Sequence, residues 1–150
     1  MTEITNDREL KAAVDRLEPA AQRALAAQFA GQVRDLIRDP ALARALDTAL
    51  APDAEKSDHE SACRTARTIA TASYTACGQD VDWNGQAEHF VAAACAAALC
   101  AERSDTGNPA WKAAIHARMA ANCRQLASAD ENRDDLVRRQ YQAAAAFAAG

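Results

Sequence analysis

The sequence predicts a single all-α domain, a mostly antiparallel bundle of six to seven helices around a buried alanine-rich helix at about residues 85–103. Alanine supplies about a quarter of the 150 residues, whereas the aromatic and β-branched residues that favour strands are scarce. The stretch from Phe90 to Ala101 carries no charge, yet it is too short and too weakly hydrophobic to cross a bilayer. We therefore expect other helices to surround this segment.

A chain of this length fits one domain, residues 1–150, and is large enough to bury a core without metals or disulfides. One internal boundary is conceivable at the charged stretch 51–57, which contains a proline. It would act as a linker between an N-terminal unit, 1–50, and a C-terminal bundle, 58–150.

Caps and prolines predict the first three helices. Thr5 or Asn6 can cap the first, Pro19 suits the first position of the second, and Asp39 with Pro40 ends the second and begins the third. Apolar residues at helical spacing give the expected inner faces. These residues are Leu10, Val14 and Leu17 in the first helix, Leu25, Phe29, Val33, Leu36 and Ile37 in the second, and Leu42, Leu46 and Leu50 in the third.

Similar signals predict the later helices. A capping box at Ser57–Glu60 begins a fourth helix that runs to about Cys77 and stops at Gly78. Asn108 begins a sixth, and a second capping box at 128–131 begins the last. The expected inner residues are Cys63, Ala66, Ile69, Ala70, Ser73 and Tyr74, then Trp111, Ile115, Met119, Cys123 and Leu126, then Leu136, Val137, Tyr141, Ala144 and Phe147.

The charges argue against nucleic acid and membrane surfaces as partners. The formal net charge is −4, and acidic and basic residues alternate along the chain without forming a basic patch. The loosely clustered arginines of the C-terminal third are expected to lie on a solvated, salt-bridged face, since acidic residues are interspersed among them. They are Arg118, Arg124, Arg133, Arg138 and Arg139.

The N-terminal sequence lacks the basic and apolar regions of a signal peptide, which predicts a cytoplasmic location. Cysteines are expected to stay reduced in that compartment. The five cysteines have no CxxC spacing, and an odd number does not suit a disulfide framework. They fit small buried apolar positions better.

The loop before the central helix carries the candidate metal ligands. Gly85 stands at position 6 of a stretch that resembles the first half of an EF-hand loop. Position 12, which needs a bidentate glutamate, is Val91, so the second half does not fit. Calcium or another divalent metal is the one cofactor suggested. The alternative is a simple turn in which Trp83 folds onto the core. The candidate ligands are Asp80, Asp82, Asn84 and Glu88, at positions 1, 3, 5 and 9.

Antiparallel pairing predicts a cluster of polar residues near the same loop. If helix pairs turn near residues 81 and 106, residues equally far from a turn lie side by side. His59 then lies about one helix length from His89, which argues against a three-histidine metal site, and Cys63 lies level with Cys100 at the far end. The predicted ligand-binding residues are Tyr74, Trp83, Glu88, His89 and Cys123, with Cys77 close by.

No catalytic residue is assigned. A nucleophilic Cys123 would need an exposed, electropositive setting with His89 in hydrogen-bond reach, and a buried thiol beside a histidine is the simpler interpretation. Glycine-rich phosphate loops, GxSxG and HExxH are missing from the sequence, as are the Glu-x-x-His pairs of di-iron bundles.

Two functions remain open. The first is a non-enzymatic helical interaction module that binds another protein or a second copy of itself, for which the leucine-bearing third helix is the candidate seam. In size and composition the chain resembles small helical bacterial proteins such as toxin-neutralising immunity proteins, which implies an inhibitor of a bacterial partner. The alternative is a metal- or small-ligand-binding protein, regulatory or catalytic, with its site at the Asp80 to His89 end.

Overall fold

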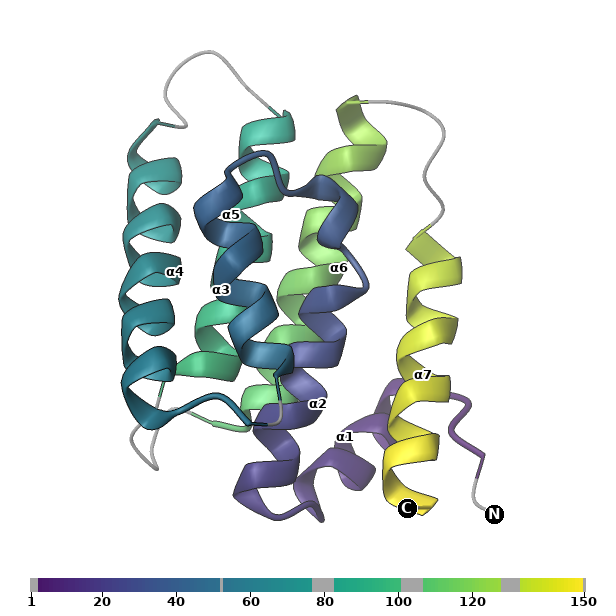
Figure 1. The fold of residues 1–150 in the computed structure, drawn as a ribbon. Helices are drawn as coiled ribbons and strands as arrows, with labels where there is room; N and C mark the ends of the chain where they lie inside the picture. Colours follow the sequence, from purple (N-terminus) through teal and green to yellow (C-terminus); the bar gives the residue numbers. More distant parts are fainter. Residues whose placement is uncertain (1–2, 52, 77–82, 101–106, 128–132, 150) are drawn as a thin grey trace.

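The structure is a computed structural model that describes residues 3–51, 53–76, 83–100, 107–127 and 133–149 (Figure 1). Within these ranges the chain forms seven α-helices, one 3₁₀ turn and no strand, which confirms the predicted all-α class. The elements are α1 (Asp7–Asp15), α2 (Pro19–Gly31), η1 (Arg34–Leu36), α3 (Pro40–Leu50), α4 (Lys56–Ala76), α5 (Trp83–Leu99), α6 (Pro109–Ala127) and α7 (Arg133–Ala149).

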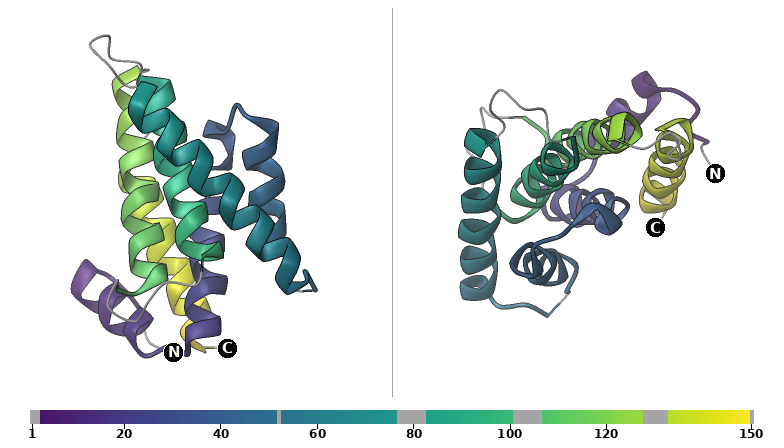
Figure 2. Two further views of the ribbon diagram at one scale, coloured as in Figure 1. Left: turned by 90° about the vertical axis from the view of Figure 1, so that its left-hand side faces the viewer. Right: turned by 90° about the horizontal axis from the view of Figure 1, so that it is seen from above.

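The alanine-rich helix α5 lies in the middle of the bundle, as predicted. It packs most extensively against α6 and α4, and also against α2, α3 and η1 (Figures 1 and 2). The helix runs from Trp83 to Leu99, so it begins earlier and ends earlier than the predicted range 85–103. Its buried residues are Ala87, Val91, Ala92, Ala94, Cys95, Ala97, Ala98 and Leu99.

Helix α6 buries its alanines against α5 and α2, and two of its larger apolar residues lie on the other side. Met119 is 39% exposed and Leu126 is 62% exposed, so the prediction that these two face inward was wrong. The short alanine side chains let α6 approach its neighbours closely, and the opposite side of a helix packed in this way is left outside. The buried alanines of α6 are Ala110, Ala113, Ala114, Ala117, Ala120 and Ala121.

Three predicted caps are confirmed. The side chain of Asn6 accepts a hydrogen bond from the Glu9 N–H at 2.9 Å, and that of Asp39 accepts one from the Ala41 N–H at 2.9 Å. Asn108 likewise accepts from the Ala110 N–H at 2.8 Å. Each cap satisfies an amide that has no partner inside its own helix.

Two predicted boundaries were wrong. Helix α2 stops at Gly31, where glycine weakens the helix, and the chain then tightens into η1 and buries Leu36. Helix α4 begins at Lys56, with Ser57 already inside the first turn, because Asp58 accepts a hydrogen bond from the Glu55 N–H at 3.2 Å. The predicted stop at Gly78 and the predicted capping box at 128–131 lie outside the described residues.

A disulfide between Cys63 of α4 and Cys100, directly after α5, joins these two helices. The two Cα atoms lie 5.2 Å apart, so the predicted register that places these residues side by side is confirmed. The expectation that all cysteines stay reduced was wrong for this pair, because the register brings both residues within bonding range. None of the described helices combines the length and hydropathy that a membrane-spanning segment requires.

Helices α1 and α7 lie on one side of the bundle and attach to α6 through a polar network (Figure 2). Its centre is Arg118, which is 4% exposed and not on a solvated face as predicted. Its Nη1 and Nη2 donate to the carboxylate of Asp7 at 2.9 and 2.8 Å, and its Nε donates to the side-chain oxygen of Gln140 at 2.7 Å. Gln140 in turn donates to the Ala114 carbonyl at 3.0 Å, so the buried polar groups support one another.

Candidate functional site

The structure describes part of the predicted site at the start of α5. Asp80, Asp82 and Cys77 lie outside the described residues, as does the side chain of Tyr74. Trp83 packs against the core, and Asn84 is exposed in the first turn of α5, whereas an EF-hand holds this position in its loop. Among the described residues, no three His, Cys, Asp or Glu side chains come together as a metal site. The calcium site therefore stays a prediction.

Glu88 supports the start of α3, a role that the sequence analysis missed. Its Oε2 accepts hydrogen bonds from the backbone N–H groups of Arg38 and Asp39, both at 2.7 Å. The Arg38 guanidinium Nε also lies 3.6 Å from Oε1, and the Glu88 side chain is only 12% exposed. These charge-assisted bonds hold the carboxylate in place, so a metal ion at this end would compete with α3 for Glu88.

His89 and Cys123 make their described contacts one helical turn away from the predicted register. His89 donates through Nδ1 to the Ala70 carbonyl of α4 at 2.8 Å, whereas Tyr74 was the predicted neighbour. The Cys123 thiol is buried and lies 3.9 Å from the side-chain oxygen of Gln86. The imidazole is thus oriented by backbone of α4, which gives His89 a structural role in the α4–α5 contact.

Phe90 contacts two histidine rings, one beside it on α5 and one on α6. Its ring centroid lies 5.0 Å from that of His89 in an edge-on arrangement and 6.1 Å from that of His116 in a stacked arrangement. Burial, followed by the nearby His89 and Lys112, lowers the pKa of His116 below its usual value. His116 is therefore neutral at pH 7 and acts as a flat packing surface.

Cys95 is the remaining buried thiol that the structure describes on α5. Burial raises its pKa to about 12, and the opposing effect of Arg34 is smaller. A completely buried thiol with this pKa is almost entirely protonated at neutral pH, which is the opposite of the exposed thiolate that a nucleophile needs.

Known proteins give no family for this chain. It matches no protein-family model, no curated protein sequence and no solved structure. Evidence about function therefore comes from its own surfaces, of which two stand out.

The first surface is a row of large apolar residues on the outside of α6, which we call the outer α6 stripe: Trp111, Ile115, Met119 and Leu126. At 3.6 residues per turn they fall within about 80° of the helix circumference. Trp111 and Ile115 are half-buried, and the Lys11 ammonium lies 5.9 Å from the centroid of the Trp111 ring. The prediction that these residues face inward was wrong for Met119 and Leu126 and is confirmed for Trp111, which packs against the core.

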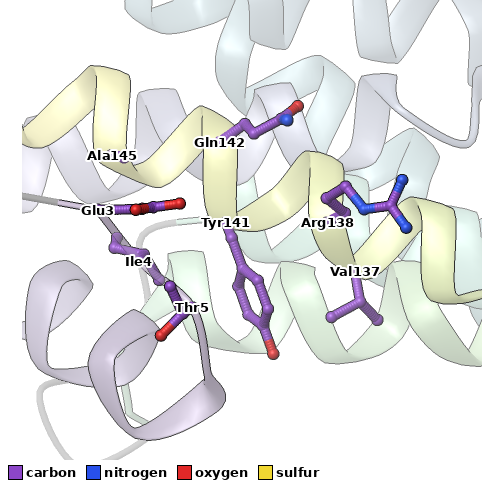
Figure 3. Close-up of a pocket in the computed structure, with 8 residues that line it drawn as sticks. All are labelled: Glu3, Ile4, Thr5, Val137, Arg138, Tyr141, Gln142 and Ala145. Atoms are coloured by element: carbon purple, nitrogen blue, oxygen red, sulfur yellow. The ribbon is translucent and has the colours of Figure 1, made fainter.

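The second surface is a groove between the segment before α1 and helix α7 (Figure 3). Its volume is about 470 Å³. Tyr141 stands in its middle and donates its hydroxyl hydrogen to Asp7 at 2.9 Å. Burial, together with this carboxylate, raises the pKa of Tyr141 and keeps the phenol protonated. The sequence offers no signal for a groove whose walls lie so far apart along the chain. The lining residues are Glu3, Ile4, Thr5, Val137, Arg138, Tyr141, Gln142 and Ala145.

Proposed function

We propose that this protein is a non-enzymatic helical interaction module that binds another protein through the outer α6 stripe. The observation that supports the proposal is the exposure of Met119 and Leu126 on a helix whose opposite side is a closed alanine face. A helix with one buried face ordinarily carries polar residues on the other. Exposed apolar side chains that gather on one side of a helix are typical of an interaction surface.

The partner that fits this surface is an amphipathic helix. A straight apolar row on one helix accommodates the apolar side chains of a second helix laid along it. The net charge of −4 suits a basic partner, because opposite potentials speed encounter and disfavour other proteins. An inhibitor of the immunity type, acting on a basic bacterial protein, would combine both properties.

The test compares two exposed apolar sites on different helices. Wild-type protein is used to isolate a partner from an extract of the source cells, and the purified partner is then titrated calorimetrically. A Met119→Glu/Leu126→Glu variant should bind at least about tenfold more weakly, because it places charges in the centre of the contact. Leu50→Glu is the matched control, since Leu50 is 42% exposed on α3. Unchanged affinity of the double variant would refute the proposal.

A second copy of the chain is a further candidate partner. The predicted seam on α3 offers little surface for it, because Leu42 and Leu46 are fully buried inside the chain and only Leu50 is exposed. Analytical ultracentrifugation of the wild-type protein would detect a dimer. If the two copies meet at the outer α6 stripe, the Met119→Glu/Leu126→Glu variant should be a monomer.

The alternative function, a metal or small-ligand site at the Asp80 to His89 end, calls for a separate experiment. Calorimetric titration with calcium, zinc and manganese tests it, with Trp83 fluorescence as a second signal. Saturable binding that Asp80→Asn/Asp82→Asn abolishes would favour a metal protein. Flat titrations with all three ions would remove the metal version of this alternative.

The compartment also remains a proposal. The sequence predicts the cytoplasm, but the disulfide between Cys63 and Cys100 favours an oxidising compartment, because cytoplasmic reductants keep most thiols reduced. Alkylation of thiols in intact cells, followed by mass measurement of the protein, would distinguish the two. A protein whose Cys63 and Cys100 are both alkylated would support the cytoplasm.

A further inference from the structure

The groove beside α7 has an apolar floor. Val137, Tyr141 and Ala145 follow one another at intervals of four residues, so they lie along one side of the helix. The buried side chain of Ile4 forms the opposite wall. An extended ligand lying in this groove would therefore rest mainly on aliphatic and aromatic carbon.

Opposite charges stand at the two ends of the groove, and the Arg138 guanidinium also lies 3.7 Å from the Asp135 carboxylate of the same helix. Figure 3 shows Glu3 on one side of Tyr141 and Arg138 on the other, with Ala145 near the Glu3 end. From Arg138 to Ala145 the helix rises about 10 Å, at 1.5 Å per residue. A ligand that lies along this part of α7 is about that long, with a cation at the Glu3 end and an anion at the Arg138 end.

Hydrogen bonds hold part of each wall of the groove before any ligand arrives. The Tyr141 hydroxyl donates to Asp7, and Asp7 is also held by Arg118, so a single carboxylate connects α7, α1 and α6. Thr5, on the wall that leads into α1, donates its hydroxyl hydrogen to Glu9 at 2.6 Å. Preformed walls lose little conformational entropy on binding, which favours affinity for a small ligand.

We propose that this groove binds a short peptide of about three residues with free termini. An extended tripeptide spans about 10 Å, at roughly 3.3 Å per residue, and so matches the rise of α7 from Arg138 to Ala145. Its N-terminal ammonium faces Glu3, its C-terminal carboxylate faces Arg138, and an apolar middle side chain rests on the Tyr141 ring. The volume of about 470 Å³ falls within the range of small-ligand pockets.

The experiment uses the full chain labelled with ¹⁵N and the tripeptide Ala-Leu-Ala as the probe. Amide NMR signals of residues 3–5 and 137–145 should shift on titration to millimolar concentration. The N-acetylated peptide and the C-amidated peptide, each lacking one terminal charge, should bind about two- to fivefold more weakly, as expected for the loss of one exposed ion pair. Absent shifts, or equal affinities for all three peptides, would overturn the proposal.

Variants assign each end of the peptide. Arg138→Gln should abolish the preference for a free carboxylate, and Glu3→Gln should abolish the preference for a free amine, while circular dichroism verifies the fold. Arg139→Gln is the matched control, because Arg139 is the next residue of α7 and does not line the groove. Retention of both terminal preferences in Arg138→Gln and Glu3→Gln would refute the assignment. The Met119→Glu/Leu126→Glu variant should bind the tripeptide with wild-type affinity. The proposal for the groove and the proposal for the outer α6 stripe can therefore be refuted independently.

Discussion

The two sides of α6 are held by different physical means. Toward α5 and α2 the contact is made by alanines that are almost completely buried. In this central part of the bundle, a disulfide also joins α4 to the end of α5. Toward α1 and α7 the attachment depends on Arg118 and its bonds to Asp7 and Gln140. The centre should therefore be sensitive to added volume, and the α1–α7 side to the loss of a charge.

Reduction of the Cys63–Cys100 disulfide should have the largest effect on stability. The bond closes a loop with a sequence separation of 37, for which the chain-entropy relation gives a loss of about 4 kcal/mol. Urea unfolding followed by circular dichroism, with and without reductant, measures it. A Cys63→Ser/Cys100→Ser variant should unfold at the same lower midpoint and be insensitive to reductant. An unchanged midpoint would mean that helix packing alone holds α4 in place.

Ala117→Leu should cost about 3 kcal/mol, because overpacking a closed contact forces side chains and backbone to shift. Ala117 is completely buried on α6. Ala146→Leu, at an exposed position of α7, should change the free energy of unfolding by less than about 0.5 kcal/mol. Comparable losses in both variants would contradict the view that only the centre is limited by volume.

Arg118→Met should cost about 2 kcal/mol, less than a fully buried ion pair, because the Asp7 side chain is 52% exposed. Methionine keeps most of the aliphatic length but removes the guanidinium that donates to Gln140 and Asp7, and Asp7 still accepts from the Tyr141 hydroxyl. Hydrogen exchange should rise mainly in α1 and α7, with α5 protected as before. Arg139→Met, which alters an exposed arginine of α7, is the control, and uniform exchange across the chain would contradict local attachment.

The protonation of His116 at low pH should destabilise the protein, and this effect should be the smallest of the four. Because the pKa of His116 is lowered on folding, the unfolded chain binds a proton that the folded chain does not. Its contribution to stability is complete at neutral pH and falls as the pH drops below the ordinary value of about 6.5. Unfolding midpoints at about pH 7.5 and pH 5.5 measure this. His116→Phe should show a weaker pH dependence, and an identical slope would assign the effect to other groups.

Local signals in the sequence predicted the helices well, but they did not determine which face of a helix is buried against its neighbours. Caps such as Asn6 and Asn108 involve amides two or three residues away, so they can be recognised from the chain itself. On α6 both the alanines and the large apolar residues recur at helical spacing, and only the close approach of α5 decides which row is buried. The choice of Met119 and Leu126 as inner residues failed for this reason.

The candidate sites likewise separate what one helix pair determines from what the packing of several helices determines. Register arithmetic brought Cys63 to Cys100, because two antiparallel helices fix that pairing. It could not predict that Glu88 reaches the backbone of Arg38, since the angle between α5 and α3 is not encoded in either helix alone. The groove likewise joins residues 3–5 with residues 137–145, so it exists only after the two ends of the chain have met.

The contact between the Glu88 carboxylate and the start of α3 also bears on the order of events in folding. The amides of Arg38 and Asp39 have their acceptor on a helix about fifty residues later in the chain, so the entrance to α3 cannot settle until that helix has arrived. In a refolding experiment, the protection of these two amide protons from exchange would report when α5 packs against the start of α3.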